Sequence, residues 1–144
     1  MKIFDYIEKD LDTMKFNRYG WDLKSTKDIK RIKKFLESAN SFTLYDEQKE
    51  KALAILSFTE YDTDKWYGLI IADECFGDNP KYAIKMKWLV WECIKRFEMK
   101  CTETESEDEE KLNKWHEFLG FKLVKKHSRK FRGHWFNLWR IEWE

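Results

Sequence analysis

The sequence predicts one α/β domain of the α+β type, spanning residues 1–144, with a mixed, mostly antiparallel central sheet flanked by helices. First, segments with helical periodicity and segments with strand alternation follow one another along the whole chain. Second, no internal repeat and no linker-like change in composition divides them. Third, 144 residues are enough to bury one sizeable core but not two.

Composition and charge exclude several classes of protein. Aromatic residues make up 17% of the chain and eight of them are tryptophan, so a core can form although 38% of the residues are charged. The net charge of +1 favours neither nucleic acid nor an anionic membrane as a partner. The longest apolar stretch, residues 66–72, is too short to span a bilayer, and the acidic N-terminus does not resemble a signal peptide. We therefore expect a cytoplasmic protein without a membrane segment.

Cysteine and histidine positions show no metal-ligand spacing. Cys75, Cys93 and Cys101 form no CxxC pair, and their odd number leaves at least one without an intramolecular disulfide. The three cysteines and three histidines therefore indicate a reducing compartment and no metal site.

The first predicted elements are a helix and a hairpin. The helix begins at Ser25 as N-cap, carries Asp28 three positions later and ends near residues 39–40. Its apolar face repeats at helical spacing through Ile29, Ile32, Phe35 and Leu36. Residues 41–45 and 52–58, joined by the charged link 46–51, read as an antiparallel hairpin.

The central segment predicts a buried strand, a loop and a long helix. Residues 66–72 are continuously apolar, as in a strand buried on both faces. A loop follows with Gly77 and the only proline, Pro80. Residues 82–97 repeat at helical spacing, and Trp88 and Trp91 widen the apolar stripe, so this helix should be largely buried.

The last third predicts a strand, a helix and a second hairpin. Residues 99–104 alternate, and the acidic run 103–110 leads into a helix whose positive dipole end it would complement. Leu112, Trp115 and Leu119 form an apolar row that should face the core. Gly120 is expected to end the helix in the left-handed conformation. Strands near residues 121–123 and 135–143 then flank a turn at residues 128–133.

This order of elements, with Leu119-Gly120-Phe121 after the last helix, resembles the GNAT superfamily of acyl-CoA-dependent N-acyltransferases. It is also similar to small, divergent GNAT-like proteins encoded by tailed phages, some of which are virion components. The resemblance implies transfer of an acetyl group from acetyl-CoA to the amine of a small molecule or a protein.

The resemblance also implies a cofactor site. In the family, a splayed strand exposes backbone amides, and the following loop and helix start bind the coenzyme A pyrophosphate. Matched by position, these are Ile71 and Ala72 in the strand, and Gly77, Asn79 and Lys81 in the loop and helix start. The family loop reads Q/R-x-x-G-x-G/A, whereas residues 76–83 read FGDNPKYA, with one glycine, an aspartate and a proline that removes an amide donor.

Two catalytic residues follow from the same resemblance. His116 lies four residues before Gly120, where family members often carry a tyrosine that protonates the departing thiolate, and histidine suits a general acid. The alternative is a surface histidine on an amphipathic helix. Glu74, or Asp73 beside it, follows the strand and could act as general base, or both could be loop residues that favour solubility. Cys75 is a nucleophile only in principle, because no base adjoins it in the sequence.

Two other functions stay open. The chain could be a non-catalytic phage protein that uses the scaffold as a virion or host-protein interaction module, because fold persists when a site is lost. Residues 122–140 hold seven Lys or Arg residues and no Asp or Glu, interleaved with aromatics, a mixture that can bind single-stranded nucleic acid. A hairpin with one solvated basic face explains that stretch more simply, so nucleic acid is an unlikely partner.

Overall fold

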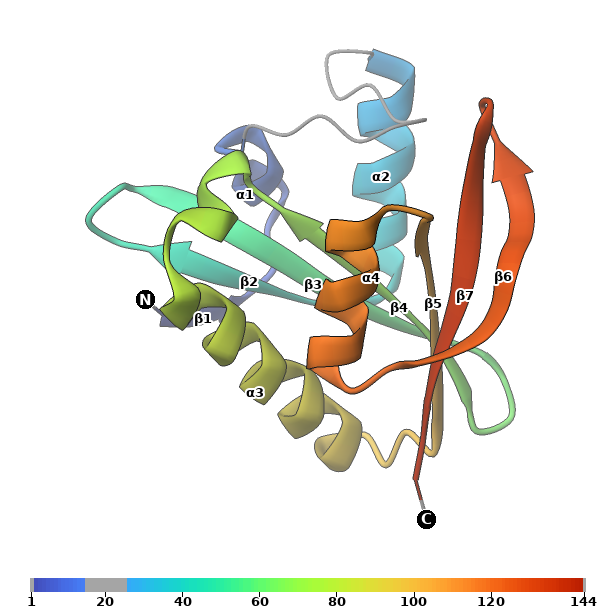
Figure 1. The fold of residues 1–144 in the computed structure, drawn as a ribbon. Coiled ribbons are helices and arrows are strands. Elements are labelled where there is room, and N and C mark those ends of the chain that lie inside the picture. Colours follow the sequence, from blue (N-terminus) through green and yellow to red (C-terminus); the bar gives the residue numbers. More distant parts are fainter. Residues whose placement is uncertain (1, 15–25, 144) are drawn as a thin grey trace. The chain divides into compact units, whose positions relative to one another are not determined.

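The computed structural model describes residues 2–14 and 26–143 (Figure 1). Their elements are β1 (Lys2–Asp5), α1 (Glu8–Asp12), α2 (Thr26–Ser38), β2 (Asn40–Asp46), β3 (Lys51–Asp62), β4 (Lys65–Ala72), the 3₁₀ helix η1 (Glu74–Asp78), α3 (Pro80–Arg96), β5 (Cys101–Glu107), α4 (Glu110–Leu119), β6 (Lys122–Phe131) and β7 (His134–Glu142). The strands form a seven-stranded sheet in the order β1-β2-β3-β4-β5-β7-β6. β4 and β5 are parallel, and the pairs β1/β2, β2/β3, β5/β7 and β6/β7 are antiparallel. The predicted α/β class with a mostly antiparallel sheet is confirmed.

Two compact units can be distinguished. The N-terminal unit comprises Met1–Thr59 and Leu69–Met86, and the C-terminal unit comprises Glu60–Gly68 and Lys87–Glu144. The N-terminal unit contains the predicted hairpin, in which Phe42 pairs with Leu56. It also contains β1 and α1, which the sequence pattern did not predict. The predicted N-cap Ser25 lies outside the described residues.

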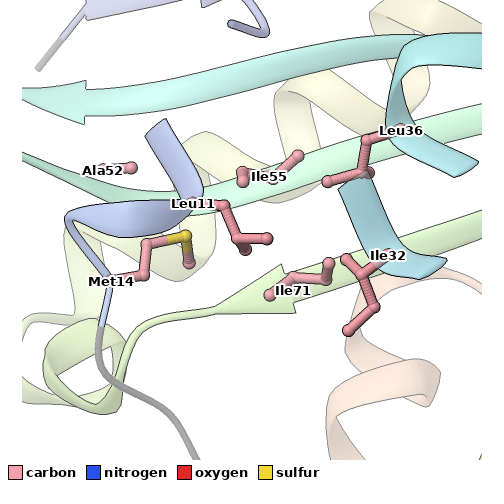
Figure 2. Close-up of a cluster of buried hydrophobic side chains, with 7 residues drawn as sticks. All are labelled: Leu11, Met14, Ile32, Leu36, Ala52, Ile55 and Ile71. Atoms are coloured by element: carbon pink, nitrogen blue, oxygen red, sulfur yellow. The ribbon is translucent and has the colours of Figure 1, made fainter. Parts of the chain in front are cut away.

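The core of the N-terminal unit packs α1 and α2 against the sheet. Figure 2 shows its buried side chains: Leu11, Met14, Ile32, Leu36, Ala52, Ile55 and Ile71. Ile32 and Leu36 lie one turn apart on α2, so they share the face that the periodicity predicted. β4 contributes the buried Ile71 and the partly buried Leu69. Only Gly68 and Ile71 of β4 are fully buried, so the expectation of a strand buried on both faces was wrong.

The acidic run leads into α4 as predicted, with Glu109 as N-cap and Glu110 in the first turn, but β5 extends to Glu107, three residues beyond the predicted strand end. Thr102, Thr104 and Ser106 are buried, and the glutamates between them point to the other face of the sheet. Glu103 and Glu105 there bind Arg140 at 3.3 Å and Arg129 at 2.6 Å, both on the final hairpin. The alternation of Thr or Ser with Glu is therefore a strand pattern.

Two further predictions need correction. The turn between β6 and β7 is Arg132–Gly133, so residues 128–131 belong to β6. Trp88 on α3 is 51% exposed, because it lies outside the stripe that buries Leu89, Val90, Cys93 and Ile94. The predicted end of α4 is confirmed, since Gly120 has a φ of 102° in the left-handed region.

Candidate functional site

The second half of β4 runs beyond the ladder that pairs β4 with β5. That ladder covers Lys65–Tyr67 of β4, whereas Leu69–Ala72 belong to the N-terminal unit. Thr104 donates its hydroxyl to the carbonyl oxygen of Gly68 at 2.8 Å, and the N–H of Asp73 donates to Leu53 on β3 at 2.8 Å. Because backbone groups alternate in direction along a strand, the N–H groups of Ile70 and Ala72 point away from β3.

This alternation separates the two residues predicted for the strand part of the cofactor site. The N–H of Ile71 is directed towards β3, and its side chain is 3% exposed in the core. The N–H of Ala72 is directed to the opposite edge of β4, the one that does not face β3. An extended ligand with amide groups could therefore pair with Ala72 and Ile70.

Asp73 organises the turn after β4. Its side chain is fully buried, forms an ion pair with Lys51 at 2.8 Å and accepts the N–H of Cys75 at 3.0 Å. Its carbonyl oxygen accepts the N–H of Phe76 at 3.0 Å. The interpretation of Asp73 as a loop residue that favours solubility was therefore wrong, and sequence reasoning missed its partner Lys51, which lies 22 positions earlier.

The N-terminus of α3 is capped from within the chain. Asn79 accepts the N–H of Lys81 through its side-chain oxygen and the N–H of Tyr82 through its carbonyl oxygen, both at 3.0 Å. Pro80 has no N–H. The first three residues of this helix therefore leave no N–H unpaired, although free amides are what makes a helix start an anion site.

The loop between these two caps is packed. Phe76 is buried and lies 6.1 Å from the ring of Tyr82, whose hydroxyl donates to Asp46 at 3.4 Å. Gly77 and the side chain of Lys81 are exposed. The residues present therefore fit the arm of a coenzyme along β4, but they do not fit its pyrophosphate by the amide route of the family.

Cys75 and Glu74, which follow Asp73, differ in the chemistry that they allow. Burial raises the pKa of the Cys75 thiol, and its hydrogen bond to Asp73 raises it further. The thiol is therefore protonated at neutral pH, which gives no support to Cys75 as a nucleophile. Glu74, at the start of η1, is exposed and accessible to water.

His116 is buried in the C-terminal unit, so the alternative of a surface histidine was wrong. The residue is 7% exposed, and its ring stacks on Trp139 at 5.5 Å and meets Phe121 edge-on at 5.8 Å. Nδ1 lies 2.8 Å from the carbonyl oxygen of Leu112. Since a carbonyl oxygen only accepts, Nδ1 carries a proton, and the ring needs a second proton on Nε2 to act as an acid there.

The predicted residues fall into both units. Ile71, Ala72, Glu74, Gly77, Asn79 and Lys81 follow one another in the N-terminal unit, and His116 belongs to the C-terminal unit. The predicted roles in catalysis and cofactor binding stay predictions.

A polar cluster in the C-terminal unit was missed because its members lie far apart in the sequence. Asp108 accepts hydrogen bonds from Asn113 at 3.1 Å, His127 at 2.8 Å and Asn137 at 3.2 Å. These bonds, that of Asn113 first, lower the pKa of Asp108 to about 2. His127 also stacks on Trp135 at 5.1 Å. The cluster ties β6 and β7 to the start of α4.

The positive charge of the hairpin formed by β6 and β7 is partly neutralised by acidic residues of the same unit. Arg129 and Arg140 bind glutamates of β5, and Lys126 lies 3.9 Å from Asp108. A solvated strand face with internal ion pairs therefore explains this stretch better than a nucleic-acid site. Within residues 2–14 and 26–143, no helix combines the length and apolar character needed to cross a bilayer. The same residues contain no cluster of three or more His, Cys, Asp or Glu side chains suited to a metal ion.

Comparison with solved structures identifies the fold. A spermidine N-acetyltransferase chimera from Vibrio cholerae and hSSAT matches with a TM-score of 0.74 at 9% identity, over 98% of this chain and 94% of that chain. The ribosomal-protein-S5-alanine acetyltransferase from Vibrio fischeri matches with a TM-score of 0.71 at 16% identity, over 97% and 91%. A GNAT-family acetyltransferase from Bacillus anthracis matches with a TM-score of 0.70 at 11% identity, over 97% and 93%.

The chain has the GNAT fold. No family model and no curated protein sequence matches it. At 9–16% identity the likeness to these GNAT structures extends to the fold and not to individual side chains. The function has to be argued from the residues of this chain.

Proposed function

We propose that the protein is an N-acetyltransferase that transfers an acetyl group from acetyl-CoA to an amine of a small molecule or a protein in the cytoplasm. The observation that supports it best is the edge of β4, where Ile70 and Ala72 direct their N–H groups away from β3 within a GNAT fold. The similar structures named above include enzymes for spermidine and for a ribosomal protein.

The transfer replaces a C–S bond by a C–N bond. The amine nitrogen attacks the thioester carbonyl carbon, the C–S electron pair leaves with sulfur, the nitrogen loses one proton and the thiolate gains one. In this proposal Glu74 accepts the amine proton through water, because its carboxylate is exposed after the strand. His116 supplies the proton to sulfur from Nε2, while the bond from Nδ1 to Leu112 holds its ring.

Thiol release in the presence of amines tests the proposal. Purified protein is incubated with acetyl-CoA and, separately, spermidine or a peptide with an N-terminal alanine, and free thiol is measured over time. We expect release above the rate without an amine, and a thermal shift equivalent to about 2.7 kcal/mol at one hundred times the dissociation constant. The absence of both thiol release and a thermal shift at millimolar acetyl-CoA would contradict the proposal.

The cap of α3 favours a second candidate. Because the N–H groups of Lys81 and Tyr82 are used by Asn79, a non-catalytic scaffold protein needs no change at this helix start. Such a protein would be a phage virion component or would bind a host protein, and exposed Trp88 and Trp135 are the kind of residue that anchors interfaces. Co-purification of a partner from the native host, with no response to acetyl-CoA, would support it.

A further inference from the structure

We infer that the protein recognises its acyl donor through the pantetheine arm alone, so that Asn79 and Pro80 exclude the nucleotide part of coenzyme A from recognition. The substrate class is then acetyl thioesters of pantetheine, with or without the 3′-phospho-ADP group. This inference rests on the proposed acetyltransferase function.

The hydrogen bonds of the turn after β4 carry the first step. Four N–H groups between Asp73 and Ala83 have partners inside the chain: Cys75 and Phe76 donate to Asp73, and Lys81 and Tyr82 donate to Asn79. Pro80 offers none. A pyrophosphate that used these groups would have to displace the chain's own oxygen atoms, so it gains little net hydrogen bonding here.

Charge around the turn carries the second step. The carboxylate of Asp73 already engages Lys51 at 2.8 Å, which removes that lysine as a partner for phosphate. Asp46 lies 3.4 Å from the Tyr82 hydroxyl. Partial burial opposes its ionisation, but the N–H groups of Lys49 and Gln48 outweigh it and lower the pKa of Asp46, so this carboxylate stays charged. Anionic phosphates would therefore meet the charged carboxylate of Asp46, which the ammonium of Lys49, 5.8 Å from the centre of the Tyr82 ring, offsets in part.

The third step concerns the edge of β4, where binding of a pantetheine arm needs no contact with phosphate. A pantetheine arm contains two amide groups, and extended ligands with amides bind by adding to a strand edge. Ile70 and Ala72, two residues apart, direct their backbone groups to the same side. This edge is present whether or not the donor carries a nucleotide.

Paired donors test the inference. Dissociation constants of coenzyme A and pantetheine are measured by calorimetry, and kcat/KM is measured for acetyl-CoA and S-acetylpantetheine with the same amine. We expect each pair of values to agree within about threefold, which corresponds to about 0.65 kcal/mol. A preference for the coenzyme A forms above about tenfold would overturn the inference and leave the acetyltransferase function standing. Absence of binding and turnover with both donors would overturn both.

A variant designed to gain recognition of the nucleotide part provides the second measurement. In the double variant Asn79→Ala/Pro80→Ala, the side-chain cap is lost and residue 80 gains an N–H, so the helix start can bind an anion. We expect coenzyme A to bind at least about fivefold more tightly than to the parent protein, with pantetheine unchanged. Asp62→Ala is the matched control, since it removes a similar side-chain bond to the N–H of Thr63 at 2.8 Å in another turn.

The control should leave both affinities unchanged, and thermal melting checks that each variant is folded. A folded double variant without a gain for coenzyme A would contradict the role given to Asn79 and Pro80. If the double variant does not fold, the comparison of donors on the parent protein decides the inference.

Discussion

The indole Nε1–H of Trp91 donates to the carbonyl oxygen of Leu119 at 2.8 Å. Leu119 is the last residue of α4, where carbonyl groups lack partners within the helix. Trp91→Phe keeps an aromatic ring and removes the donor, so the free energy of unfolding should fall by about 1–2 kcal/mol. Urea denaturation measures the change. Trp88→Phe, at an exposed position, should change stability by less than about 0.5 kcal/mol; equal losses in both variants would contradict the role of the bond.

Gly120 and Gly133 both have a left-handed backbone, but substitution by alanine should lower stability by different amounts at the two positions. A Cβ on Gly120 would lie 2.9 Å from Cζ2 of Trp91, whereas a Cβ on Gly133 would meet no atom within 4 Å. Gly133→Ala should therefore cost about 1–2 kcal/mol, for the left-handed backbone alone. Gly120→Ala should cost more, because the Trp91 ring must also move. Thermal or urea denaturation of the two variants in parallel tests the difference, and equal costs would contradict it.

The Lys51–Asp73 pair predicts a large effect from one substitution. Asp73 has no exposed side-chain surface, so Lys51→Met leaves a buried carboxylate without its cation. The free energy of unfolding should fall by about 3 kcal/mol. Lys2→Met is the control, because the Lys2–Glu47 pair is exposed on both sides and should contribute at most about 1 kcal/mol. If the two losses were equal, the burial of the Asp73 pair would not matter for stability.

Asp108 predicts a dependence of stability on pH. Its pKa of about 2 in the folded state lies below the ordinary value of about 3.9 for an unfolded chain. The carboxylate therefore contributes stability that is fully present above about pH 4 and is lost as the pH falls towards 2. Asp108→Asn should be less stable than the parent at pH 7, and the difference should shrink between about pH 4 and pH 2. Urea denaturation at pH 7, 4 and 3 measures it; a constant difference would contradict the assignment.

His116 links the proposed reaction to a defined side chain. Because a lost general acid typically costs about 10²-fold, His116→Ala should lower turnover by that factor and leave the affinity for the donor nearly unchanged. Its stability should also fall, since the ring packs on Trp139 and Phe121.

Separate values of kcat and KM distinguish the two effects for this variant. Loss of the acid should lower kcat of the folded variant and leave KM for the donor nearly unchanged, whereas loss of packing alone should lower only the fraction of folded protein. His127→Ala is the control, because His127 also stacks on a tryptophan but lies in the polar cluster of Asp108. Full activity of His116→Ala would contradict the assignment of the acid.

Periodicity predicted the elements whose apolar residues repeat, and it failed where the repeat is polar. The hairpin of β2 and β3, helix α3 and the end of α4 at Gly120 all follow from apolar spacing and glycine chemistry. The strand β5 was predicted, but its extension to Glu107 was missed because its buried residues are Thr and Ser, which a hydrophobic pattern does not count. The acidic run and the basic hairpin were interpreted separately, although Arg129 and Glu105 are partners across 24 positions.

An error of one residue, between Trp115 and His116, explains the misreading on α4. The sequence placed Trp115 in the core, but Trp115 is only half-buried, and it stacks on Phe118, which is 40% exposed. Leu119 faces the core as predicted, and His116, three residues before it, faces the core in place of Trp115. A histidine counts as polar in any periodicity, so its burial needed the aromatic ring of Trp139, which the sequence places 23 residues later.

The caps at Asp73 and Asn79 were readable only in part. The place of Pro80 after the loop is typical of a helix start, and Pro80 opens α3. That Asn79 occupies the N–H of Lys81 depends on backbone geometry, and the burial of Asp73 depends on Lys51 from another strand. Local signals therefore gave the boundaries of this turn but not the partners of its amides.

Strand β6 ends the strand order of the sheet, so one of its long sides offers backbone groups to a strand from another molecule. Its ladder with β7 shifts register twice, between Leu123 and Arg129, and His127 there has a φ of 52°. Lysines recur along the same strand, and it is mostly exposed. Charges and irregular backbone oppose the addition of a further strand. Concentrated solutions of the protein should therefore resist growth of fibrils along this edge, and replacing Lys122, Lys125 and Lys126 by threonine should shorten the lag before thioflavin-positive aggregates form.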